Sequence, residues 1–68
     1  MDPQQIKAYN ESIQYCTTLL SKLEWEKDTI RSCFHGEPLR AYLEATELAI
    51  QRTKYLRDTL HRLQQMQP

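Results

Sequence analysis

The sequence predicts an all-α fold, an antiparallel two-helix hairpin with coiled-coil-like packing. Two long stretches, about residues 3–34 and 38–64, repeat apolar residues at helical spacing. The only glycine of the chain, Gly36, lies between them and is followed closely by Pro38. Because Gly and Pro interrupt helices, we expect the chain to reverse direction there and bring the two stretches side by side.

The length and charge of the chain limit the classes of function. Its 68 residues are enough for one small domain, and domains of this size usually need disulfides, a metal or association for stability. With 9 basic and 9 acidic residues the net charge is zero, so we expect no nucleic acid as a partner. The first residues lack a signal-peptide pattern and no apolar run approaches ~20 residues, which predicts a cytoplasmic protein without a membrane span.

The first helix, about residues 3–34, has a clear start signal and one regular apolar seam. Asp2 is a good N-cap, and Pro3 suits the first helical position. Apolar residues then alternate at spacings of three and four, as in a coiled coil. The seam comprises Ile6, Tyr9, Ile13, Cys16, Leu20, Leu23, Lys27, Ile30 and Phe34. We expect the Lys27 ammonium to reach water while its stem lies along the seam; the alternative is that Lys27 fixes the register.

The second helix, about residues 38–64, follows a turn at residues 35–37. Gly36 can take the left-handed conformation that closes a helix, and Pro38 suits the first turn of the next one. The main apolar stripe of this helix comprises Leu39, Tyr42, Leu43, Thr46, Ala49, Ile50, Thr53, Leu56, Leu60 and Leu63. A second stripe lies beside it and comprises Ala41, Ala45, Leu48 and Tyr55. This helix therefore has more apolar surface than the first helix can cover.

Uncovered apolar surface predicts that the hairpin is completed by self-association or by a protein partner. The candidate partner-binding residues are Ala41, Ala45, Leu48 and Tyr55 of the second helix and Tyr15, Leu19 and Trp25 of the first. Trp25 falls on the polar face, where it is either a binding hot spot or a ring lying flat along its own helix. Tyr15 and Tyr55 are interface or boundary residues, whereas Tyr9 and Tyr42 are expected in the core. Leu56→Glu is accordingly expected to damage the hairpin and Leu48→Glu to weaken association.

No pattern in the sequence indicates an enzyme, a cofactor or a small-molecule substrate. His35 and His61 fall far apart along the predicted hairpin, and Cys33 with His35 offers two ligands where a structural zinc site takes four. Cys16 and Cys33 lie about 25 Å apart along one helix, too far for a disulfide. With one glycine in the chain there is no glycine-rich phosphate loop. We therefore expect a non-enzymatic protein without a metal site.

The layout resembles the small E-type co-chaperones of type III secretion needle subunits, the YscE-like helical hairpins. The resemblance rests on Gly36 at the turn, Tyr42 early in the second helix and the run Glu47-Leu48-Ala49-Ile50. It implies a cytoplasmic helper that pairs with a larger helical-repeat chaperone and holds a needle subunit before export. Two other hypotheses are a structural homodimer that forms a four-helix bundle and, less favoured, a bundle that binds nucleic acid.

Overall fold

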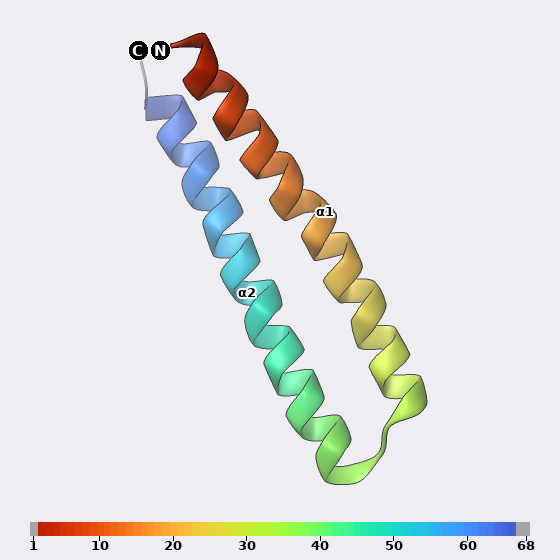
Figure 1. The fold of residues 1–68 in the computed structure, drawn as a ribbon. Coiled ribbons are helices and arrows are strands. Elements are labelled where there is room, and N and C mark those ends of the chain that lie inside the picture. Colours follow the sequence, from red (N-terminus) through yellow and green to blue (C-terminus); the bar gives the residue numbers. More distant parts are fainter. Residues whose placement is uncertain (1, 67–68) are drawn as a thin grey trace.

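The computed structural model describes residues 2–66, which form two helices running side by side in opposite directions (Figure 1). Helix α1 spans Pro3–Cys33 and helix α2 spans Gly36–Met66. The predicted all-α hairpin is confirmed. The start of α1 and the end of α2 lie at one end of the hairpin, and the turn lies at the other (Figure 1). With Cα extents of 51 × 15 × 11 Å, the molecule is a long layer two helices wide.

The start of α1 is capped as the sequence predicts. Asp2 has extended backbone angles (φ −61°, ψ 137°), and its side chain accepts a hydrogen bond from the backbone N–H of Gln4 at 2.9 Å. Pro3 follows at the first helical position, where a missing N–H costs nothing. The cap satisfies one of the N–H groups that the first turn leaves without a helical acceptor.

The turn differs from expectation in how Gly36 is used. Helix α1 ends at Cys33, because Phe34 is extended (φ −125°, ψ 156°) while its N–H still donates to the Ile30 carbonyl at 3.0 Å. Gly36 has the expected positive φ of 65°, but it begins α2 instead of closing α1. The left-handed residue thus redirects the chain into the second helix. Phe34 and Tyr42 then pack across the turn with ring centroids 5.3 Å apart.

The buried core is small and lies along the seam between the helices. From α1 it contains Cys16, Leu20 and Ile30, and from α2 it contains Ile50, which is 3% exposed. Two threonines of α2 are also buried there, Thr46 and Thr53. Their hydroxyls donate to the carbonyls of Tyr42 and Ala49, at 2.9 and 2.7 Å, so burial leaves neither hydroxyl unsatisfied.

Two polar contacts join the helices. Lys27 Nζ lies 2.6 Å from Glu47 Oε1, and the Lys27 side chain is 18% exposed. Its ammonium thus pairs with the partly exposed carboxylate of Glu47 on α2. Near the terminal end of the hairpin, Gln64 Nε2 donates to Asn10 Oδ1 at 2.9 Å. Both contacts join α1 to α2, and the alternative that Lys27 fixes the register stays a prediction.

The side of α2 that faces α1 is only half apolar. Its buried and half-buried seam residues recur every three or four positions: Leu39, Leu43, Thr46, Ile50, Thr53, Arg57, Leu60 and Gln64. Four members of the predicted main stripe lie outside this seam: the half-buried Ala49, and Tyr42, Leu56 and Leu63, which are 51%, 50% and 38% exposed. The expectation that Tyr42 is a core residue is therefore wrong. Polar residues occupy seam positions while large apolar ones remain exposed.

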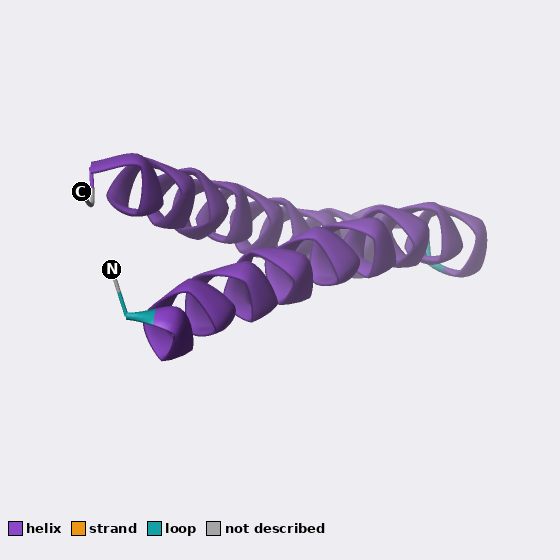
Figure 2. Cartoon of the chain, turned by 90° about the horizontal axis from the view of Figure 1, so that it is seen from above, coloured by secondary structure: helices purple, strands orange, loops and turns teal. Residues whose placement is uncertain are grey.

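The hairpin is far less compact than a globular domain of its size. Viewed from above, the helices cross and their terminal ends spread apart (Figure 2). The Cα radius of gyration is 15.6 Å, against about 11 Å for a compact chain of this length. The accessible surface is 5326 Å², about 800 Å² more than the roughly 4,500 Å² expected of a folded 8.1 kDa monomer.

Candidate protein-interaction surface

Three hollows open along one side of the seam. One of about 290 Å³ lies between Tyr9 of α1 and Leu60 of α2. The next, of about 360 Å³, lies between Tyr15 and Leu56, and the third, of about 270 Å³, is lined by Trp25, Cys33 and Tyr42 among others.

Residue spacing places these hollows on the same side of the hairpin. Ser12, Leu19, Glu26 and Cys33 are each seven residues apart on α1, and Tyr42, Ala49, Leu56 and Leu63 are each seven apart on α2. Residues seven apart share one side of a helix. We call this side the groove surface, which comprises Ala8, Ser12, Tyr15, Leu19, Cys33, Tyr42, Ala49 and Leu56.

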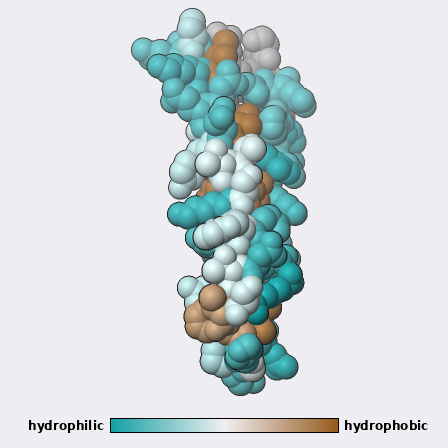
Figure 3. Space-filling view, turned by 90° about the vertical axis from the view of Figure 1, so that its right-hand side faces the viewer, coloured by the Kyte–Doolittle hydropathy of each residue, from teal (hydrophilic) through white to brown (hydrophobic). Residues whose placement is uncertain are grey.

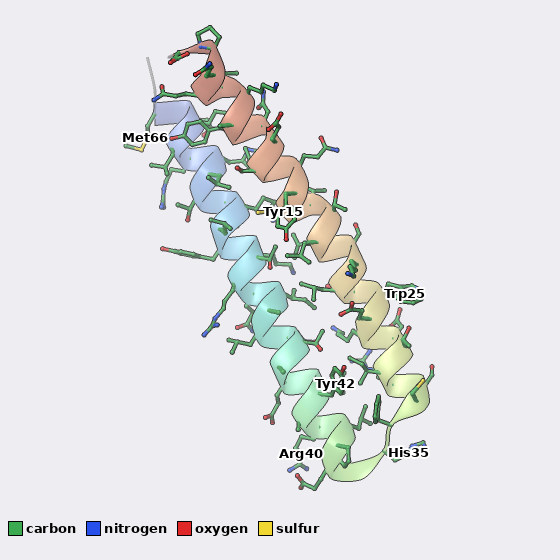
Figure 4. The ribbon with its side chains drawn as sticks, in the orientation of Figure 1. Tyr15, Trp25, His35, Arg40, Tyr42 and Met66 are labelled. Atoms are coloured by element: carbon green, nitrogen blue, oxygen red, sulfur yellow. The ribbon has the colours of Figure 1, made fainter. Side chains whose placement is uncertain are left out.

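Large apolar side chains of both helices are exposed on the groove surface. Tyr15 is 67% exposed, and Tyr42 and Leu56 are about half exposed. Tyr15 and Tyr42 lie over the space between the helices, while Trp25 projects from the outer side of α1 (Figure 4). Trp25 thus forms the outer rim of the third hollow, where it lies beside Thr29 and Cys33. The groove surface is a row of apolar hollows with aromatic walls, which is typical of surfaces that bind protein.

The opposite side of the seam is polar. Asn10, Glu24 and Arg31 of α1 lie there with Glu47 and Lys54 of α2, at helical positions again seven or fourteen apart. The Lys27–Glu47 ion pair lies on this side, and Glu24 lies 3.9 Å from the same ammonium. The outward side of α1 is also mostly hydrophilic or of intermediate hydropathy, with hydrophobic atoms showing at several heights and a cluster of them near the turn (Figure 3). The hairpin as a whole is therefore amphipathic.

The ion pair shifts the titration of both its members. The hydrogen bond that Lys27 donates to Glu47 raises the pKa of Lys27 above its ordinary 10.5 and lowers the pKa of Glu47 below its ordinary 4.5. A lowered carboxyl pKa stabilises the fold above pH 4.5, and this contribution is lost as pH falls through the folded-state value. A raised ammonium pKa stabilises the fold below pH 10.5 and is lost as pH rises through the folded-state value. The pair therefore supports the fold at neutral pH.

The predicted partner-binding residues fall on two different surfaces. Tyr15 lies on the groove surface with the half-buried Leu19, and Trp25 lies at the rim. The other four are exposed on the outer surface of α2, which we define as Ala41, Ala45, Leu48 and Tyr55. Leu48 is 47% exposed and lines a separate hollow with Leu43, Glu47 and other residues of α2. The structure thus does not bring the seven residues together.

Tyr42 and Leu56 are the groove residues that the sequence interpretation missed, because it placed them in the core. The signal was present in the spacing of α2. Two overlapping apolar series run along this helix, and they share Leu39, Thr46, Thr53 and Leu60. One series also contains Leu43 and Ile50. The other also contains Tyr42, Ala49, Leu56 and Leu63. Only one series can face α1, and Glu47, the partner of Lys27, lies within one helical turn of Leu43 and Ile50 in the buried series.

The described residues carry few other chemical features. Cys16 is a buried free thiol and Cys33 an exposed one. Between residues 2 and 66 no three histidine, cysteine or acidic side chains come together as metal ligands would. Neither α1 nor α2 is long and apolar enough to cross a membrane. Compared with known proteins, the chain matches no family model, no curated protein and no solved structure.

Proposed function

We propose that the protein is a non-enzymatic interaction module, a small cytoplasmic adaptor or co-chaperone that binds a larger helical protein through the groove surface. The observation that carries this proposal is the row of hollows between Tyr15, Leu56 and Tyr42. These three side chains are at least half exposed, although each lies beside the seam that already packs one helix. A helix of a partner laid along the hollows would extend that seam.

Burying the exposed apolar area of these three side chains would contribute favourable free energy to binding. Fully burying a large apolar side chain contributes roughly 1.5–3 kcal/mol, so completing the burial of Tyr15, Tyr42 and Leu56 contributes roughly 3–5 kcal/mol. That gain must exceed the cost of immobilising the partner, so further contacts around the three residues are needed. Leu19, Ala49 and Cys33 lie on the same surface and supply them.

The finer proposal is a co-chaperone in type III secretion. It rests on Gly36, Tyr42 and residues 47–50, which resemble the E-type family. Under this proposal the larger partner is a helical-repeat chaperone, and the complex holds a needle subunit before export. Tyr42 would then have two roles, closing the turn against Phe34 and lining the groove.

The test compares two leucines of α2 with similar exposure on different surfaces. Tagged wild-type chain, Leu56→Glu and Leu48→Glu would each be expressed in the native cell, and bound proteins identified by mass spectrometry. Leu56 is 50% and Leu48 is 47% exposed, so the two changes are matched in chemistry and in damage to the hairpin. We expect a helical protein that is captured by the wild type and by Leu48→Glu but lost from Leu56→Glu.

Other outcomes would contradict the proposal in different ways. If Leu48→Glu alone loses the partner, the binding surface is the outer surface of α2. If the wild-type chain captures no protein that the tag alone does not capture, the adaptor function is wrong. Far-ultraviolet circular dichroism of each purified variant confirms that the helices are retained.

A further inference from the structure

The groove surface continues the interface that already joins α1 to α2. Leu39, Thr46, Thr53 and Leu60 face α1, and the same four residues also belong to the series that runs through Tyr42 and Leu56. The second series has the same alternating spacing of three and four as the series that packs against α1. A helix with two adjoining series of this kind has one packing surface for each of two neighbours. The hairpin provides only one of those neighbours.

The uncovered area matches what a dimer needs. The chain exposes 5326 Å², about 800 Å² more than a compact monomer of its mass. A standard protein interface buries about 800 Å² on each partner. Pairing two hairpins through an interface of that standard size would remove about the excess area from each copy. The result would be a four-helix bundle with both polar sides facing water.

The charge of the groove rim suits a second copy. Glu11 and Glu26 line the hollows on the α1 side. Lys22 lies seven residues after Tyr15, so a base occupies the same rim. A two-fold interface sets one surface against itself, and like charges repel unless the surface carries both signs. With equal numbers of acidic and basic residues, the whole chain also has no net repulsion between copies.

We propose that a second copy of the chain covers the groove surface when no other partner is bound, giving a two-fold symmetric four-helix bundle. This inference rests on the proposed function, because it assigns the same surface. Self-association and partner binding are then mutually exclusive. Within residues 2–66 the hairpin buries only four apolar side chains, and a second copy of the chain stabilises it until the larger partner replaces that copy.

The first experiment measures mass by sedimentation equilibrium over about a hundredfold range of concentration. The wild-type chain should have twice the single-chain mass and dissociate on dilution. Tyr15→Glu and Leu56→Glu should each raise the dissociation constant at least about tenfold, because a two-fold interface loses the substituted side chain from both copies. Leu48→Glu is the matched control and should leave the constant within about threefold. A helical wild-type chain of single mass throughout, or an equal effect of Leu48→Glu, would overturn the inference.

A second measurement covers the case in which the variants unfold when they dissociate. A dimer assembled from equal parts of carbon-13-labelled and unlabelled wild-type chain gives nuclear Overhauser effects between copies. The inference requires such contacts from the Tyr15 or Tyr42 ring or the Leu56 methyl groups. Contacts confined to Leu48 and Tyr55 would place the interface on the outer surface of α2 and overturn it.

The two proposals can fail separately. A monomeric wild-type chain that still captures a helical partner through Leu56 contradicts the dimer and leaves the adaptor function intact. A groove-mediated dimer that no captured protein dissociates contradicts the adaptor function and leaves the dimer intact. Sedimentation of the purified chain with and without the partner distinguishes these outcomes.

Discussion

Replacing Ile50 by alanine should destabilise the hairpin much more than replacing Leu48, two residues earlier on the same helix. Ile50 is 3% exposed, whereas Leu48 is 47% exposed. Truncating a buried Ile to Ala costs about 2–5 kcal/mol, because the lost burial and the remaining cavity both contribute. At Leu48 about half of the side chain is already in water and no enclosed cavity forms, so the expected loss is about 1 kcal/mol.

Thermal melts followed by circular dichroism at one fixed chain concentration measure this difference. For a chain of this size, 1 kcal/mol corresponds to about 4–8 °C in Tm. We expect Leu48→Ala to lower the Tm by about that amount and Ile50→Ala by at least about 10 °C. The concentration is held fixed because association changes the apparent Tm. Equal losses, or a larger loss for Leu48→Ala, would mean that a different side of α2 faces α1 and would refute the assigned seam.

Three further predictions test the ends and the register of the helices. The Glu47→Gln variant should lose less stability than the wild type when the pH falls below 4.5, because Lys27 lowers the pKa of Glu47 in the fold. Urea titrations at several pH values measure this, and equal acid losses in the two chains would contradict it. Asp2→Ala should cost about 1 kcal/mol by removing the bond to the Gln4 N–H, whereas Asp2→Asn should retain most of it. Gly36→Ala should cost about 1 kcal/mol through the positive φ of 65° alone, since no atom lies within 4 Å of the added carbon; an unchanged Tm would show that the turn adopts another conformation.

Most of the fold could be predicted because local signals agree with the tertiary arrangement. In α1 the Asp2 cap and a single unbroken seam leave one possible face, and Cys16, Leu20 and Ile30 are buried as that seam requires. The turn was located by Gly36, whose positive φ was expected, although the helix that it belongs to was not. These features depend on residues within one or two turns of each other.

The interaction surface was harder to predict because α2 has two adjoining apolar series. Choosing between them requires knowing which residue of α1 lies opposite, and that depends on contacts between residues far apart in sequence. In the structure the series with Leu43 and Ile50 faces α1, Lys27 pairs with Glu47 beside it, and Leu56 is half exposed. The expectation that Leu56→Glu breaks the hairpin is corrected accordingly, since half of that side chain is exposed to solvent in the single hairpin.

Hydroxyl-radical footprinting of the aromatic side chains tests most directly whether the groove is the binding surface. In the single hairpin Tyr15 and Tyr55 are 67% and 72% exposed, so both should react readily in an unassociated chain. On association with a second copy or a helical partner, we expect the reactivity of Tyr15 and Tyr42 to fall severalfold while that of Tyr55 stays unchanged. Protection of Tyr55 with no change at Tyr15 would contradict the account.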